Sequence, residues 1–127
     1  MPTSMCNARC GYCYELGIPN KQHMTKEVVD QVCRYIIEKA PQDITISFFG
    51  GEPLYNKDVI TTITSRVRAS GKKFSVSIIS NGYLFDKDTV DEAVYDWGLS
   101  NVQITLDGTE EVYNKTKNYI YKDVNAF

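Results

Sequence analysis

Three segments of the chain alternate apolar and polar residues with a period of two. They cover residues 43–49, 74–79 and 101–106, and they are rich in β-branched and aromatic side chains. A period of two places every second side chain on the same face of an extended strand. The alternation therefore predicts three β-strands, and the shorter segment 2–5 is a candidate for a strand that precedes them.

The segments between these strands carry apolar residues at helical spacing. A first helix is predicted to follow Thr25 as its N-cap, and a second begins at Asn56 and ends near Gly71. A third follows Asp86 and ends at Gly98, which suits a left-handed C-terminal cap. The predicted inward stripes are Val28, Val32 and Ile36; Val59, Ile63 and Val67; and Val90, Val94 and Trp97.

The predicted strands recur about every 30 residues, which is the length of a βαβ unit. Strands that alternate with helices form parallel sheets with right-handed crossovers. The sequence therefore predicts an α/β fold of about four parallel βα repeats, which amounts to part of a TIM-like barrel. Residues 123–127 are predicted to begin a fourth helix. We expect residues 1–127 to be the N-terminal part of one such domain, truncated from a longer chain and unable to turn over alone.

Composition narrows the class of protein further. The chain has 14 basic and 16 acidic residues, a net charge of -2 and 43% hydrophobic residues, which is typical of a soluble globular domain. The slightly acidic balance favours a function without a nucleic-acid partner. No apolar run is long enough to span a membrane, and the opening Met-Pro-Thr-Ser-Met-Cys leads us to expect no signal peptide. We expect a cytoplasmic protein, in which clustered cysteines bind metal more often than they pair.

Unusual motifs follow each of the four predicted strands. Because active sites form at the carboxyl ends of parallel strands, this placement predicts one shared site. The motifs are Cys6, Cys10 and Cys13 after segment 2–5; Gly50-Gly51-Glu52-Pro53 after 43–49; Ser80-Asn81-Gly82 after 74–79; and Asp107-Gly108 after 101–106.

The spacing of Cys6, Cys10 and Cys13 allows one loop to direct three thiolates at one centre. A cubane iron–sulfur cluster usually takes four cysteines, so three would leave one iron open to another ligand. A zinc site completed by His23 or Cys33 is the alternative, and a disulfide framework is a further one. Cys33 fits the buried stripe of the first predicted helix, and His23 lies on a polar stretch.

The pattern Cys-x-x-x-Cys-x-Tyr-Cys resembles the signature of the radical S-adenosylmethionine superfamily, and Gly-Gly-Glu-Pro resembles its glycine-rich motif. Residues 2–10 and 105–108 further resemble the subgroup that modifies peptides and proteins. That subgroup includes anaerobic sulfatase-maturating enzymes and thioether-forming peptide maturases with a SPASM-type C-terminal domain. Two departures are Lys117, where arginine is usual, and Tyr113-Asn114, where His-Asp is frequent.

The resemblance implies a role for individual residues. Cys6, Cys10 and Cys13 would ligate a [4Fe-4S] cluster whose open iron takes the amino and carboxylate groups of S-adenosylmethionine. Tyr12 would reach the adenine through its backbone. The remaining implied contacts are Gly50, Gly51 and Glu52 at the methionine amino group, Thr105 near the ribose or carboxylate, and Lys117 at the carboxylate.

The resemblance also implies an activity. A reduced flavodoxin- or ferredoxin-type donor would supply an electron, and cleavage of S-adenosylmethionine would give a 5′-deoxyadenosyl radical that abstracts hydrogen from a peptide or protein. Two alternatives remain open at this point. The first is a radical enzyme that acts on a small molecule, and the second is a non-enzymatic zinc-binding module.

Overall fold

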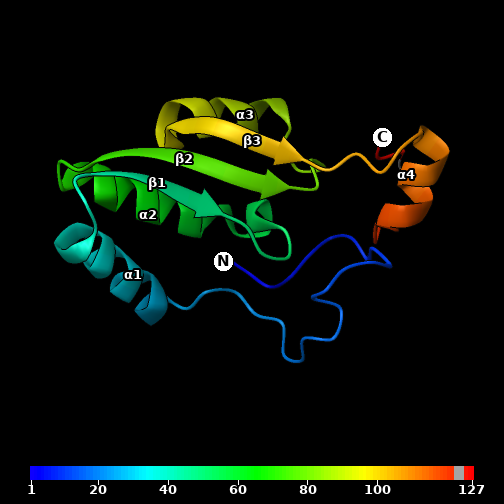
Figure 1. Ribbon diagram of the computed structural model, residues 1–127, viewed down its shortest axis with the longest axis horizontal. Helices are drawn as coiled ribbons and strands as arrows, with labels where there is room; N and C mark the ends of the chain where they lie inside the picture. Colours follow the sequence, from blue (N-terminus) through cyan, green and yellow to red (C-terminus); the bar gives the residue numbers. More distant parts are fainter. Residues whose placement is uncertain (122–124) are drawn as a thin grey trace.

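A computed structural model describes residues 1–121 and 125–127, and it forms a three-stranded parallel sheet with helices between the strands (Figure 1). The strand order is β1-β2-β3, so the α/β class and the parallel βα repeats are confirmed. The elements are α1 (Lys26–Lys39), β1 (Asp43–Phe48), a short 3₁₀ helix (Pro53–Asn56), α2 (Lys57–Ala69), β2 (Lys73–Ser80), α3 (Lys87–Glu92), a π-helical turn (Ala93–Trp97), β3 (Leu99–Ile104) and α4 (Glu110–Lys117).

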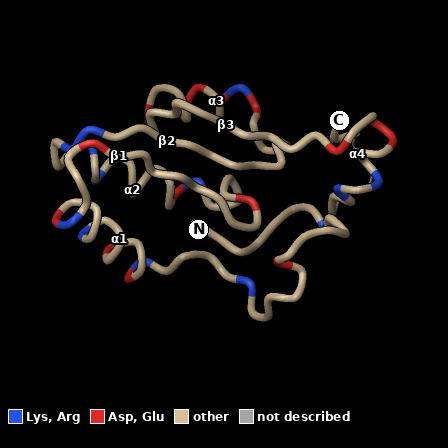
Figure 2. The backbone as a smooth tube through the Cα atoms, viewed as in Figure 1, with Lys and Arg blue, Asp and Glu red and all other residues tan. Residues whose placement is uncertain are grey.

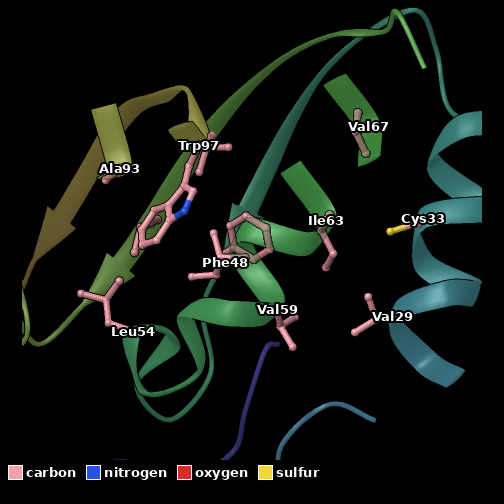
Figure 3. Close-up of a cluster of buried hydrophobic side chains, with 12 residues drawn as sticks. Val29, Cys33, Phe48, Leu54, Val59, Ile63, Val67, Ala93 and Trp97 are labelled. Atoms are coloured by element: carbon pink, nitrogen blue, oxygen red, sulfur yellow. The ribbon is translucent and has the colours of Figure 1, made fainter. Parts of the chain in front are cut away.

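The main core lies between one face of the sheet and the helices that cover it (Figure 3). Phe48 and Trp97 pack on the sheet side, and Ile63 of α2 lies between them and Cys33 of α1. Trp97 is fully buried, and its Nε1 donates a hydrogen bond to Oγ1 of Thr61 at 2.9 Å. Cys33 is also fully buried, as expected for a thiol that behaves as a small apolar side chain.

Two helices differ in part from their predicted inward faces. In α1, Val32 and Ile36 pack against the core as predicted. In α1, Thr25 caps the helix as expected, but Val28 is exposed while its neighbour Val29 is buried with Cys33. In the third helix, Val90 and Val94 are 41% and 49% exposed, so their predicted inward positions are wrong. The residues that face inward there are Thr89, Ala93 and Trp97.

The physical reason is the π-helical turn at Ala93–Trp97, which follows α3 directly. A π turn closes its hydrogen bonds over five residues and so has more residues per turn than an α-helix. Residues three apart therefore no longer share a face, so Val94 turns away from Trp97, while Ala93, four residues before Trp97, stays on its face. Gly98 ends this turn with a positive φ of 76°, as the sequence predicted.

Residues 2–5 do not form a strand of the sheet. The additional strand that was expected there, before β1, is therefore absent from the described residues. Thr3 forms only an isolated antiparallel bridge with His23. The backbone nitrogens of Gly51 and Glu52 donate to the carbonyls of Thr3 and Met5 at 3.2 and 2.8 Å. The segment therefore pairs with the loop that follows β1 rather than with β1 itself.

The glycines of that loop explain the pairing. A Cβ built on Gly51 would lie 2.2 Å from the carbonyl oxygen of Met5, and one on Gly50 would lie 2.5 Å from that of Thr3. Gly50 also has a φ of 145°, which favours glycine. The two glycines thus allow the backbone leading to Cys6 to lie directly against the end of β1.

Helix α4 was not predicted. Thr109 precedes it, Glu110 and Glu111 fill its first turn, and it buries Tyr113 and Lys117 at a spacing of four. The predicted helix start at residues 123–127 falls partly on residues 123 and 124, which lie outside the described residues, and Asn125–Phe127 is not helical.

Basic and acidic residues are interspersed along the backbone (Figure 2). This mixture agrees with the near-neutral composition. Among the helices in the described part of the chain, none is long and apolar enough to cross a bilayer.

Candidate cofactor site

The three strands point toward the side of the molecule where the N-terminal coil and α4 lie (Figure 1). A cavity of about 230 Å³ opens at this end, as expected for a parallel sheet. Eight of the nine residues predicted for the site line the cavity: Cys6, Cys10, Tyr12, Cys13, Gly50, Gly51, Thr105 and Lys117. Glu52 is the exception.

The cysteine loop is held by its own backbone and by α4. All four cysteines of the chain carry free thiols, so the disulfide framework is not formed. The Sγ of Cys6 accepts from the amide of Ala8 at 3.3 Å, and the thiol of Cys10 donates to the carbonyl of Lys117 at 3.6 Å. Burial raises the pKa of the Cys6 and Cys10 thiols above the ordinary value.

The donor set fits a cluster. Three thiols line one cavity, and thiolates are the ligands of iron–sulfur clusters. Within residues 1–121 and 125–127, no three His, Cys, Asp or Glu side chains converge closely enough for one metal ion. Thiolates on a cubane bind separate irons, so they need not converge as the ligands of a single zinc ion do.

Glu52 lies beneath the cavity and is fully buried. Its Oε1 accepts from the amide of Leu54 at 3.1 Å and from the hydroxyl of Ser80 at 2.9 Å, and its Oε2 accepts from the amide of Asn81 at 2.9 Å. Burial raises the pKa of Glu52, and these hydrogen bonds oppose the rise. The carboxylate therefore joins the ends of β1 and β2 and does not line the cavity, where the sequence had placed it.

Asn81 connects this carboxylate to the cysteine loop. Its Nδ2 donates to Oδ1 of Asn7 at 2.8 Å and lies 3.7 Å from Sγ of Cys6. Its carbonyl accepts from the hydroxyls of Tyr113 and Tyr119 at 3.1 and 3.2 Å. Asn81 lines the cavity, in agreement with the shared site predicted for the motif Ser80-Asn81-Gly82.

Lys117 closes the other side of the cavity. It is 3% exposed, its Nζ lies 3.1 Å from Oδ2 of Asp107, and it donates to the hydroxyl of Tyr12 at 3.0 Å. Burial lowers the pKa of Lys117, but the hydrogen bonds that its ammonium donates to Tyr12 and Asp107 outweigh this effect, and the net shift is upward. The sequence placed Asp107 in a motif at the end of a strand, and its ion pair with Lys117 is visible only in the fold.

Two buried side chains at the site have an atom without a hydrogen-bond partner among the described residues. They are Asn7, through Nδ2, and Glu15, through Oε2. Glu15 lines the cavity and was not singled out from the sequence. Its place two residues after Cys13 is the signal that could have identified it.

The fold and the cysteine cavity define a cofactor-binding βα domain. A comparison with protein-family models identifies the family. Residues 1–125 match the Radical SAM superfamily, and the chain belongs to that family. The cofactors of this family are a [4Fe-4S] cluster and S-adenosylmethionine (AdoMet), and its members are enzymes.

Particular relatives are similar to this chain over most of its length. A GTP 3′,8-cyclase of Alkaliphilus metalliredigens (strain QYMF) is 36% identical over 109 residues, which are 83% of this chain and 32% of the cyclase. A solved structure of native anSMEcpe with AdoMet and the Kp18Cys peptide has a TM-score of 0.79 and 22% identity, covering 94% of this chain and 33% of that one.

A second structure, native anSMEcpe with AdoMet, has a TM-score of 0.80 at 22% identity and covers 94% of this chain and 34% of that one. At this identity the likeness concerns the fold. The chain spans about one third of the length of the relatives it matches.

Proposed function

We propose that this chain is the cofactor-binding part of a radical AdoMet enzyme that modifies a peptide or protein. One observation carries the proposal: Cys6, Cys10 and Cys13 line the same cavity as Gly50 and Gly51, at the carboxyl ends of three parallel strands. When bound, the cluster and AdoMet supply reductive cleavage of the sulfonium to a 5′-deoxyadenosyl radical. The protein positions these groups and limits the access of water.

Different residues of the cavity would position the cluster and AdoMet. Cys6, Cys10 and Cys13 hold the cluster, and Gly50 and Gly51 bring the end of β1 against the cysteine loop. Tyr12, Thr105 and Lys117 are the remaining candidates for contacts with AdoMet. Glu52 is a positioning residue, because it is fully buried, accepts from Leu54, Ser80 and Asn81, and is not among the residues that line the cavity.

The resemblance of residues 2–10 and 105–108 to the peptide- and protein-modifying subgroup supports a peptide over a nucleoside triphosphate. A fold like that of anSMEcpe, which was solved with a peptide, agrees with this choice.

A small-molecule substrate is the second candidate, and the 36% identity to a GTP 3′,8-cyclase favours it. The test uses the full-length protein, because residues 1–127 are not expected to turn over alone. It measures 5′-deoxyadenosine formed by that protein, anaerobic and cluster-loaded, with dithionite as reductant. One arm receives GTP and the other a cysteine-containing peptide. The proposal expects the peptide alone to raise product formation above the level without substrate, and a rise with GTP alone would reverse it.

A reduced flavodoxin- or ferredoxin-type protein is the proposed electron donor. Replacing dithionite by either donor with its reductase should sustain the same product formation. A cytoplasmic location follows from this dependence on a reducing compartment and remains part of the proposal.

A further inference from the structure

The backbone carbonyls of the cysteine loop, residues 6–13, do not all find a partner in the backbone. The carbonyl of Asn7 accepts from the amide of Ile120 at 2.9 Å. The carbonyls of Cys6 and Ala8, on either side of it, accept from no amide of the described backbone. Backbone carbonyls are strong acceptors, so these two need a donor from a side chain or from water.

The guanidinium of Arg9 is the donor to both carbonyls. Its Nη1 donates to the oxygen of Cys6 at 2.7 Å and to the oxygen of Ala8 at 2.8 Å. Both distances are short for an N–H···O hydrogen bond, as expected when the donor is charged. The side chain of Arg9 therefore folds back onto its own loop, between the first two cysteines of the motif.

The backbone of Arg9 is held as well. Its amide lies 3.1 Å from the carbonyls of Lys117 and Asn118, and Ala8 forms an antiparallel bridge with Tyr119. The end of α4 therefore anchors the residue that carries the guanidinium. Among the described residues, no carboxylate lies within ion-pair distance of Arg9, so no acidic partner neutralises its charge.

Arg9 is exposed and does not line the cavity, whereas Cys6 and Cys10 do. It can therefore influence a bound cluster only through the loop and through the field of its charge. A reduced cluster carries one more negative charge than an oxidised one, and charge is among the features that set cluster potentials. A positive charge held on the ligand loop stabilises the reduced form more than the oxidised form.

We propose that Arg9 is a positioning residue for the cluster. By binding the carbonyls of Cys6 and Ala8 it holds the ligand loop, and it keeps a positive charge beside Cys6 and Cys10 that makes the cluster easier to reduce. The inference rests on the proposed function, since it takes Cys6, Cys10 and Cys13 as the cluster ligands. It assigns Arg9 no contact with AdoMet.

The test measures the reduction potential of the full-length, cluster-loaded protein by a redox titration followed by EPR. Arg9→Gln and Arg9→Met remove the charge, and both should shift the potential to more negative values. Arg9→Lys keeps the charge but loses the planar fork, so its potential should stay nearer to that of the parent protein. Arg34→Met is the matched control, because Arg34 is exposed on α1 and should leave the potential unchanged.

Salt supplies a second readout of the charge. Because Arg9 is exposed, dissolved ions screen it, and the Debye length falls from about 30 Å at 0.01 M to about 3 Å at 1 M ionic strength. The difference in potential between the parent protein and Arg9→Met should therefore shrink as salt is added. A difference that does not depend on salt overturns the inference, because it would come from a rearranged loop.

The hold on the loop is measured by the anaerobic rate of cluster loss to excess EDTA. Arg9→Met removes both hydrogen bonds and should lose the cluster about fivefold faster than the parent protein. Loss at the parent rate overturns the inference. Faster loss with an unchanged potential also overturns it, because Arg9 would then only stabilise the loop. A shift in potential for Arg9→Lys as large as for Arg9→Gln overturns it too, because lysine keeps the charge.

The outcome distinguishes this inference from the proposed function. If the parent protein forms a cluster whose EPR spectrum responds to AdoMet, and no Arg9 variant changes the potential, the inference alone is wrong. If the parent protein forms no iron–sulfur cluster, the proposed function and the inference both fail.

Discussion

The ammonium of Lys117 lies 3.1 Å from Oδ2 of Asp107, and the two side chains are 4% and 14% exposed. The pair joins the end of α4 to the loop that follows β3. Through its hydrogen bond to Tyr12, Lys117 also fixes the cysteine loop. A residue expected to meet the cofactor therefore already holds three parts of the site together.

Lys117→Met should destabilise the protein by about 3 kcal/mol, because it leaves the shielded carboxylate of Asp107 without its partner. Urea unfolding followed by the fluorescence of Trp97, the single tryptophan, measures the change. Lys87→Met is the matched control. Its ion pair with Asp91 is 85% and 49% exposed, and its loss should cost less than about 1 kcal/mol. Equal losses in the two variants would contradict the structural role of Lys117.

Glu52→Ala should destabilise the protein by about 3 kcal/mol at acidic pH, since three donors lose their acceptor and a buried volume is left empty. Ser80→Ala removes one of these hydrogen bonds and should cost about 1 kcal/mol. Both values come from urea unfolding. A cost for Glu52→Ala no larger than that for Ser80→Ala would show that the network is not cooperative.

The stability of the protein should also depend on pH through Glu52. Its pKa in the folded protein is raised above the ordinary 4.5, so the folded state binds this proton more tightly than the unfolded chain does. The corresponding stability is fully present below 4.5 and is lost as pH rises through the higher folded pKa. The gap in unfolding free energy between the parent protein and Glu52→Ala should therefore narrow with rising pH, and a widening gap would reverse the assigned direction.

Gly51→Ala should destabilise the protein by more than about 3 kcal/mol, because its Cβ would lie 2.2 Å from the Met5 carbonyl oxygen. The displaced segment leads directly to Cys6, so the iron bound after anaerobic reconstitution should fall as well. Gly11→Ala is the control within the cysteine loop. Nothing lies within 4 Å of a Cβ at Gly11, and both stability and iron content should stay close to the parent values.

Asn81→Ala should make the reduction potential of the cluster more negative. Its Nδ2 lies 3.7 Å from Sγ of Cys6, and hydrogen bonds to cysteine sulfur are among the features that set cluster potentials. A redox titration followed by EPR measures the shift. Asn101→Ala, on the exposed part of β3, is the comparison and should leave the potential unchanged. The same potential in all three proteins would remove Asn81 from this role.

The sequence predicted the parallel strands and the shared site because both depend on local patterns. Alternating residues identified β1, β2 and β3, and the cysteine spacing identified the loop without any knowledge of its neighbours. Helix faces were harder to predict. The π-helical turn at Ala93–Trp97 changes which residues face inward, and a period of 3.6 does not anticipate it.

Contacts between distant segments account for the other differences. Residues 2–5 have the composition of a strand, but Gly50 and Gly51 allow them to pair with a loop instead. The resemblance assigned Glu52 to the cofactor amine, and only the fold shows that Leu54, Ser80 and Asn81 donate to its carboxylate. The buried Oε2 of Glu15, which has no hydrogen-bond partner among the described residues, is likewise visible only in the folded structure.

The central claim is that Cys6, Cys10 and Cys13 hold a cluster that binds AdoMet. The most direct measurement is anaerobic reconstitution with iron and sulfide, followed by EPR of the dithionite-reduced protein with and without AdoMet. We predict about four irons and four sulfides per chain, and an EPR spectrum that changes when AdoMet is added. Stoichiometric zinc bound without sulfide would contradict the account. So would a reduced cluster whose EPR spectrum is the same with and without AdoMet.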